Sequence, residues 1–301
     1  MSDFKLDFLC VGFPKCGTSS LHSVLKRMPE LELPYNKKET CFFAWSKNYE
    51  DPVDMFQKRY FPHAFTEETR LIRGAVEPSF VKHSEGVRQY FGSDIKLVFM
   101  LRNPADAEWS AFKMALRRVR TRKTSSLYLK SNNDLQRMFR IYLESIIKTA
   151  PADSVDYFYD RWLNDYLKVY PKEQMHFILF EDFIQNYQKE MESLSSFLGF
   201  QISELPELHK RNTGDKISKD YRSAEINRIL YNISIKARNS GTNHEVFWNQ
   251  KVAPQVQRYT LMPVQESISE ENRRLVLDYF HDSILHAAEV TGLPLEECWL
   301  K

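Results

Sequence analysis

The segment from Gly12 to Ser20 has the composition and spacing of an anion-binding loop. It reads Gly-Phe-Pro-Lys-Cys-Gly-Thr-Ser-Ser, with Lys15 between its two glycines and three hydroxyl side chains after the second. Glycines let a backbone approach an anion closely, and the N–H groups at the start of a helix point toward it. The segment therefore predicts a phosphate or sulfate site. The alternative is a turn that only caps a helix.

A second pattern of this kind begins at Arg102. The apolar run Val98–Leu101 leads into Arg102, Asn and Pro follow, and Ser110 comes eight residues after the arginine. Ligands of open α/β sheets bind at the carboxyl ends of strands, where such an arginine and a serine on the next helix can meet one anion. An arginine in an ordinary surface ion pair is the alternative.

Together the two segments resemble those of the PAPS-dependent sulfotransferase family, particularly its heparan-sulfate and bacterial carbohydrate type. The first resembles the family's 5′-phosphosulfate loop and the second its 3′-phosphate segment. The resemblance implies that the donor is 3′-phosphoadenosine 5′-phosphosulfate (PAPS), that no metal is needed, and that Arg102 and Ser110 hold the 3′-phosphate. In the first loop it implies donor contacts by Lys15, Cys16, Gly17, Thr18, Ser19 and Ser20.

The expected catalytic groups are Lys15 and Glu39. Residues 37–43 read Lys-Lys-Glu-Thr-Cys-Phe-Phe, which resembles the family's Glu-x-x-Phe-Phe element and implies that Glu39 is the base. Lys15 would stabilise the charge on the departing phosphate oxygen. Two alternatives remain open. Glu39 is a solvated partner of Lys37 or Lys38, or the base is one of the histidines His22, His63 and His83.

Three further segments bear on the donor and the acceptor. Residues 209–219 resemble the loop that covers the donor, with Lys216 and Lys219 as candidate phosphate contacts. The basic stretch 113–123 is either a solvated helix face or a landing surface for an anionic acceptor. Residues 75–78, Ala-Val-Glu-Pro, stand where the family usually has Glu-Lys-Ser/Thr-Pro, so the identity of the acceptor carries over less well than that of the donor.

Alternating strand and helix patterns predict the elements that position these residues. Apolar runs indicate strands at 8–11, 71–76, 95–101 and 175–180, and helical spacing indicates helices at 105–119, 134–149, 183–198 and 270–290. Another helix follows the first loop and ends at Pro29. In the helix over 270–290 we expect one apolar stripe against the core, formed by Leu275, Tyr279, Ile284 and Ala287. The alternation predicts a parallel sheet flanked by helices.

The composition limits the classes of protein that remain. With 42 basic and 40 acidic residues the net charge is +2, which argues against a nucleic-acid binder. The four cysteines form no CxxC pair and no metal-ligand spacing, which is typical of a reducing compartment. No apolar run approaches the length of a membrane span. We therefore expect a cytoplasmic protein without stable membrane insertion.

These observations predict one α/β domain over residues 1–301 with a P-loop-like nucleotide-binding fold, and a mobile covering region at 207–263. The expected function is transfer of a sulfuryl group from PAPS to a hydroxyl acceptor, preferably a glycan and one that carries negative charge. One alternative is a P-loop kinase, which would need a lysine directly after a glycine, and this chain has Lys15 before Gly17. The other is a non-catalytic protein that binds a nucleotide or a sulfated glycan.

Overall fold

The computed structural model describes most of the chain in two compact units. The described residues are 5–35, 37–42, 53–62, 71–120, 135–149, 155–208, 219–221, 233, 261–263 and 267–301. The first unit comprises Met1–Ala107, Pro151–Arg211 and Leu277–Lys301, and the second comprises Glu108–Ala150 and Asn212–Val276. A single domain over 1–301 stays a prediction, and each unit is described by itself.

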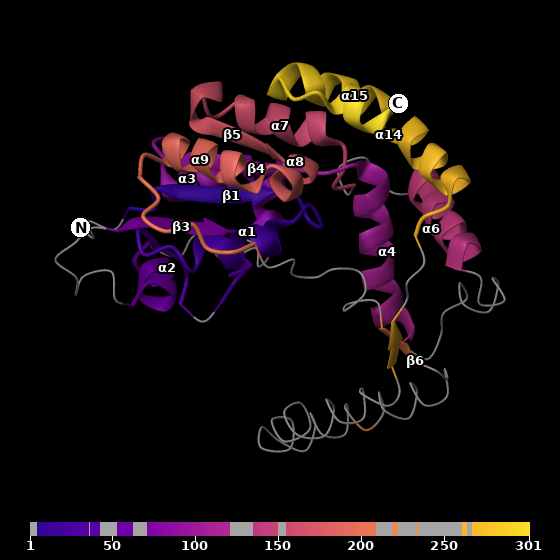
Figure 1. Ribbon diagram of the computed structural model, residues 1–301, viewed down its shortest axis with the longest axis horizontal. Helices are drawn as coiled ribbons and strands as arrows, with labels where there is room; N and C mark the ends of the chain where they lie inside the picture. The colour runs from indigo at the N-terminus through magenta and orange to yellow at the C-terminus, as the bar shows by residue number, and fades with distance from the viewer. Residues whose placement is uncertain are drawn as a thin grey trace. The chain divides into compact units, whose positions relative to one another are not determined.

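A parallel sheet forms the centre of the first unit (Figure 1). Its five strands have the order β2-β3-β1-β4-β5, and all neighbours pair in parallel. This confirms the sheet that the apolar runs predicted. Strand β2 was missed because two residues are too short for a periodic signal. The strands are β1 (Phe8–Gly12), β2 (Leu31–Glu32), β3 (Ile72–Val76), β4 (Lys96–Leu101) and β5 (Met175–Leu179).

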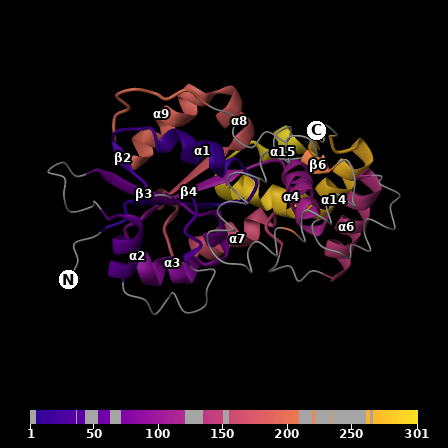
Figure 2. The same cartoon turned by 90° about the horizontal axis from the view of Figure 1, so that it is seen from below.

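Helices cover both faces of this sheet. Helices α1, α8 and α9 lie on one side, and α2, α3 and α7 lie on the other (Figure 2). Strands between two helical layers are nearly continuous apolar runs, and every residue of β1 is buried. The helices that lie wholly in the first unit are α1 (Thr18–Leu25), α2 (Val53–Tyr60), α3 (Ser84–Phe91), α7 (Tyr159–Leu167), α8 (Phe180–Gln185), α9 (Tyr187–Leu198) and α15 (Leu295–Trp299), with short 3₁₀ helices η2 (Pro78–Lys82) and η4 (Lys172–Gln174).

Two predicted helix boundaries were wrong. The helix expected over 183–198 is two helices, because Asn186 leaves the helical conformation (φ −117°, ψ 38°) between α8 and α9. Neither glycine nor proline marks this break, so the apolar spacing runs through it. Helix α1 ends at Leu25 rather than at Pro29, and the chain continues in single turns, in which Arg27 N–H donates to the Val24 carbonyl.

The described part of the second unit contains helices and a short antiparallel strand pair. Helix α4 (Pro104–Arg120) begins in the first unit and continues in the second, which also contains α6 (Leu135–Thr149), β6 (Lys219–Tyr221) and β7 (Leu261–Pro263). Trp109 lies 5.5 Å from Phe112 and 5.0 Å from Phe139 between ring centroids. The predicted bounds of α4 and α6 are correct to within one residue.

The long helix α14 (Glu270–Thr291) buries a different stripe from the one expected. Its buried apolar residues are Val276, Phe280, Ile284 and Ala287, while Leu275 and Tyr279 are only half-buried. Phe280 packs on Phe158, with ring centroids 5.0 Å apart. Two adjacent rows of this helix are apolar, so spacing alone could not decide which of them faces the core.

Candidate functional site

The loop after β1 is shaped for close approach of an anion. Phe13 N–H donates to the Met100 carbonyl (3.0 Å), which ties the loop to β4. Lys15 and Gly17 have left-handed φ angles of 65° and 90°, and α1 starts directly afterwards at Thr18. The first N–H groups of a helix lack intrahelical acceptors and carry the positive end of its dipole. The anion site predicted from the sequence therefore has a loop and a helix start of the right form.

Gly17 is required both by its conformation and by its surroundings. A Cβ atom at this position would lie 2.3 Å from Cδ2 of Phe180, the first residue of α8. We expect Gly17→Ala to lower the free energy of unfolding by about 2–4 kcal/mol, since left-handed strain and overpacking add. The matched control is Gly199→Ala, which has the same left-handed conformation (φ 89°, ψ 38°) and whose added Cβ would meet only Lys96 Nζ, at 3.7 Å. Urea unfolding should show the smaller loss there, and equal losses would contradict this account.

Arg102 joins the second predicted segment to the first. It follows β4 directly, and its Nη1 donates to the Lys15 carbonyl at 3.1 Å. The guanidinium lies over the Phe180 ring, 4.7 Å from the centroid. Its Nε is buried and has no hydrogen-bond partner among the described residues. A buried donor with no partner is costly, and an anionic ligand would satisfy it.

Tyr159 supports the contact between Arg102 and the loop after β1, although it lies far from both in the sequence. Its hydroxyl donates to the Arg102 carbonyl (2.7 Å) and lies 3.5 Å from Cys16 Sγ. Cys16 N–H donates to the Phe13 carbonyl (3.2 Å), and burial raises the pKa of its thiol to about 12. In this structure the contacts of Cys16 shape the loop, and its predicted donor contact stays a prediction. Sequence reasoning missed Tyr159, which lies 143 residues from Cys16.

Glu181 fixes the turn that follows Arg102. Its Oε1 accepts the Asn103 N–H at 3.0 Å, and Asn103 Oδ1 accepts the Ala105 N–H at 2.9 Å. Burial raises the pKa of Glu181, and the nearby charge of Arg102 lowers it by less. The exit from β4 and the start of α4 are thereby held in one conformation, which keeps Arg102 beside the loop.

Glu39 is brought beside the loop by its neighbour Lys38. Lys38 Nζ lies 2.5 Å from Glu39 Oε1 and 3.4 Å from Thr18 Oγ1. The side chain of Lys38 is 26% exposed and that of Glu39 37%, so the pair faces partly into solvent. The alternative in which Glu39 pairs with Lys38 thus describes the contact correctly. The same contact brings the carboxylate near the start of α1, and its role as the base stays a prediction.

Three cations gather around the loop. Burial is the largest cause that lowers the pKa of Lys15, and the positive charges of Arg102 and Lys38 lower it further. Cations held together in a partly desolvated place favour a bound anion, which relieves their mutual repulsion. Sequence reasoning treated Lys38 only as a partner of Glu39 and missed it as part of this cation group.

Glu77 is a buried carboxylate that the motifs did not indicate. It follows β3, is 0% exposed, and accepts N–H groups from Thr40 and from Cys41 (3.2 Å). Its own N–H donates to the Cys10 carbonyl at 2.7 Å. Burial raises the pKa of Glu77 to about 7, although the hydrogen bonds from Thr40 and Cys41 lower it. Thr40 and Cys41 are thus attached to the end of β3 through this side chain.

The raised pKa predicts a pH dependence of stability. Between its ordinary value of 4.5 and about 7, Glu77 binds a proton in the native state but not in the unfolded state. The free energy of unfolding therefore falls as pH rises through this window, by on the order of 2–3 kcal/mol. Glu77→Gln should lack this component, whereas Glu85→Gln, at an exposed position of α3, should keep it. Equal pH dependence of urea unfolding in wild type and Glu77→Gln would contradict this.

The remaining predicted donor contacts lie in the second unit or outside the described residues. Ser110 is half-buried on α4 in the second unit, and Lys219 begins β6 there. Lys216 lies outside the described residues, as do most of 207–263 and the side chains of 115–123. In the basic stretch, Lys113 Nζ lies 5.5 Å from the Trp109 ring centroid. The donor contacts expected of Ser110, Lys216 and Lys219 stay predictions.

The three histidines that rival Glu39 differ in their surroundings. His22 is buried within α1. His83 is half-buried before α3, and burial, followed by the charge of Lys82, lowers its pKa. His63 lies outside the described residues. Lys38, the direct neighbour of Glu39, contacts Thr18 at the start of α1.

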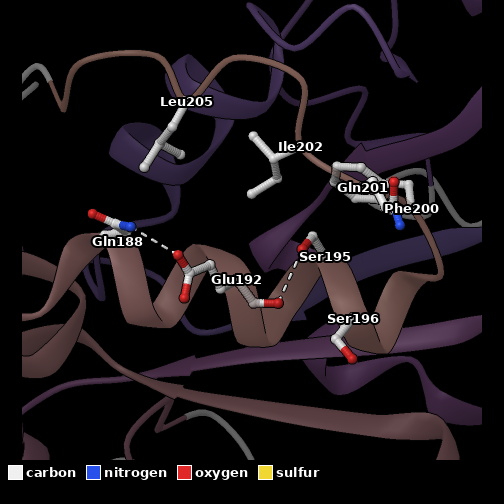
Figure 3. A pocket seen from close by; sticks show the side chains of 8 residues that line it. All are labelled: Gln188, Glu192, Ser195, Ser196, Phe200, Gln201, Ile202 and Leu205. Atoms are coloured by element: carbon white, nitrogen blue, oxygen red, sulfur yellow. Dashed lines mark hydrogen bonds between the residues drawn. The ribbon is translucent and has the colours of Figure 1, made fainter.

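A separate hollow of about 590 Å³ lies along α9 and the chain that follows it (Figure 3). Gln188 Nε2 donates to Glu192 Oε1 (2.8 Å), and Ser195 Oγ donates to the Glu192 carbonyl (2.9 Å). No residue of the loop after β1 or of residues 37–42 lines it. Its lining residues are Gln188, Glu192, Ser195, Ser196, Phe200, Gln201, Ile202 and Leu205.

Comparison with known proteins identifies the family. The family described as "Sulfotransferase domain" matches residues 5–249, which include both anion-binding segments and Glu39. This chain belongs to the sulfotransferase family. The fold agrees, since the crystal structure of a sulfotransferase from Alicyclobacillus acidocaldarius superposes with a TM-score of 0.60 at 18% identity, covering 99% of this chain and 100% of that one.

A second similarity covers only part of each of the two proteins. This chain is 23% identical over 123 residues to the "Membrane-associated sulfotransferase kil1" of Dictyostelium discoideum. The match covers 40% of this chain and 25% of the relative. Within the described residues of this chain, every helix is too short or too polar to cross a membrane.

Proposed function

We propose that this sulfotransferase transfers a sulfuryl group from PAPS to a hydroxyl of a carbohydrate acceptor. One observation carries the proposal. Arg102, at the carboxyl end of β4, donates to the carbonyl of Lys15 in the loop after β1. The two segments expected to hold the two phosphate ends of one nucleotide thus meet at the same edge of the sheet, where ligands of such sheets bind.

The described residues fit such a donor. The loop provides left-handed turns at Lys15 and Gly17, the hydroxyls of Thr18 and Ser19, and the N–H groups at the start of α1. Arg102 has a buried Nε without a hydrogen-bond partner among the described residues. We propose that the loop with Lys15, Cys16, Gly17, Thr18, Ser19 and Ser20 holds the 5′-phosphosulfate end, and that Arg102 holds the 3′-phosphate together with Ser110. Lys216 and Lys219 are proposed as further contacts.

In the proposed reaction Glu39 acts on the acceptor, whereas Lys15 and Lys38 act on the donor. The bound donor supplies the sulfuryl group. Glu39 accepts the proton of the acceptor hydroxyl while the oxygen bonds to sulfur and the bond between sulfur and the phosphate oxygen breaks. Lys15 stabilises the charge that develops on that phosphate oxygen. Lys38 lies between Glu39 and Thr18 and adds a second positive charge at the same place.

The proposed acceptor is a carbohydrate and the proposed location is the cytoplasm. A carbohydrate acceptor rests on the resemblance of residues 12–20 and 37–43 to the heparan-sulfate and bacterial carbohydrate type. The basic stretch 113–123 would favour an acceptor that already carries negative charge.

A cytoplasmic enzyme is part of the proposal. Cell fractionation with an antibody against the chain tests it, and recovery of the chain with membranes would contradict it.

Labelled sulfate tests the proposed reaction directly. Purified enzyme is incubated with ³⁵S-labelled PAPS and a panel of neutral, carboxylated and sulfated glycans, without added divalent metal. We expect label in at least one glycan, together with stoichiometric binding of adenosine 3′,5′-bisphosphate (PAP) in calorimetry. Binding of PAP without transfer to any acceptor, including small alcohols, would favour a non-catalytic binder. Absence of PAP binding would overturn the proposal.

A further inference from the structure

We infer that Glu77 is a positioning residue, which holds the segment carrying Lys38 and Glu39 against the donor-binding loop. The inference rests on the proposed function, because it takes Glu39 as the base. It concerns a side chain that has no part in the chemistry proposed above. Glu77 comes directly after β3 and before η2, whose 3₁₀ turn starts at Pro78.

The carboxylate of Glu77 binds two consecutive backbone groups of this segment. One oxygen accepts the N–H of Thr40 and the other accepts the N–H of Cys41. Glu77 is 0% exposed, so water cannot replace either bond, and a buried N–H without an acceptor costs about 1–3 kcal/mol. Thr40 directly follows Glu39, and the position of the base therefore depends on this clamp.

The backbone at this point is bent in a way that needs support. Cys41 has a left-handed φ of 50°, which is unfavourable for a residue with a side chain. Thr40 Oγ1 accepts the Phe42 N–H at 3.3 Å. Phe42 is buried and packs on Phe56 and Tyr90, with ring centroids 5.3 and 5.0 Å away. The bend thus sends Phe42 into the core and leaves Glu39 and Lys38 at the surface.

Glu77 does not act as the base itself. It is fully buried, and its two oxygens are occupied by the N–H groups of Thr40 and Cys41. Glu39 is 37% exposed and lies next to Lys38, which reaches Thr18 of α1. Above about pH 7, where Glu77 is ionised, a carboxylate also suits the clamp better than an amide, because both of its oxygens accept, whereas a glutamine would turn an NH₂ group toward one of the two N–H groups.

The test compares Glu77→Gln and Glu77→Asp with a matched control. Asp7→Asn is the control because Asp7 also uses a side-chain oxygen to accept a backbone N–H, that of Arg73 at 2.9 Å, but lies before the amino end of β1. Amide hydrogen exchange of Thr40 and Cys41 reports the clamp without any turnover. Turnover with PAPS and an acceptor gives kcat and KM, and calorimetry gives the Kd for PAP.

We expect Glu77→Gln to speed exchange of the Thr40 and Cys41 amides at least tenfold and to lower kcat about 10- to 100-fold. The Kd for PAP should change less than about threefold, because the loop after β1 and Arg102 remain in place. Glu77→Asp, which keeps both acceptor oxygens, should recover part of kcat and of the protection. Asp7→Asn should leave exchange at Thr40 and Cys41 unchanged.

Two results would overturn the inference. Unchanged exchange at Thr40 and Cys41 in Glu77→Gln would show that the clamp does not hold the segment. Faster exchange with unchanged kcat would show that the segment's position does not matter for turnover. A failure of the proposed function looks different, since wild-type enzyme would then transfer no sulfate. The exchange data would in that case still decide whether Glu77 holds residues 38–41.

Discussion

Glu39→Gln is expected to slow sulfuryl transfer about 10²- to 10⁴-fold, since the amide cannot accept the proton of the acceptor hydroxyl. The Kd for PAP should change little, because Glu39 is joined to the donor-binding loop through Lys38, whose Nζ lies 2.5 Å from Glu39 Oε1 and 3.4 Å from Thr18 Oγ1. Single-turnover kinetics with labelled PAPS measures the transfer step, and calorimetry measures PAP binding.

The control for this prediction is Glu32→Gln. Glu32 is also a half-buried carboxylate in an ion pair, with Arg73 Nε at 2.7 Å, but it lies on β2. Its replacement removes an ion pair and a charge without touching the loop after β1, so turnover should stay within about twofold of wild type. Unchanged turnover in Glu39→Gln would exclude Glu39 as the base while leaving the sulfotransferase assignment intact.

Arg102→Ala is expected to weaken PAP binding about 10²-fold. Loss of a hydrogen bond to a charged group costs about 1.5–3 kcal/mol, and 1.4 kcal/mol is a factor of ten. The substitution also removes the bond from Nη1 to the Lys15 carbonyl, which is 3.1 Å long, so the loop after β1 loses one support. Calorimetry with PAP checks the affinity, and thermal unfolding checks that the protein remains folded.

Arg88→Ala is the matched control for Arg102→Ala. Arg88 also lies over an aromatic ring, 5.7 Å from the centroid of Tyr170, but on α3. The Arg88→Ala variant should lose a similar contact between a guanidinium and a ring while its affinity for PAP stays unchanged. Arg102→Lys separates charge from shape, because lysine keeps the charge but not the planar set of donors. If Arg102→Ala bound PAP as well as Arg88→Ala does, Arg102 would not be a phosphate ligand.

The sequence by itself determined the fold class and the family. Strands between two helical layers are apolar along their whole length, so β1, β4 and β5 are visible as apolar runs to within one or two residues. The segment Gly12–Ser20 was recognisable because a left-handed turn requires glycine, and the structure has φ 90° at Gly17. These signals are local, and they need no knowledge of distant parts of the chain.

The tertiary structure alone decided which side chains surround Lys15 and Glu39. Tyr159 meets Cys16 across 143 residues, Arg102 meets Lys15 across 87, and Glu77 meets Thr40 across 37. Glu77 lies in the segment 75–78, which departs from the family's pattern, and a glutamate in a sequence is normally solvated. Its role comes from the sheet order, which sets the end of β3 beside the end of β1. Hydrogen bonds between segments that are distant in sequence depend on that order, and hydrophobic spacing does not encode it.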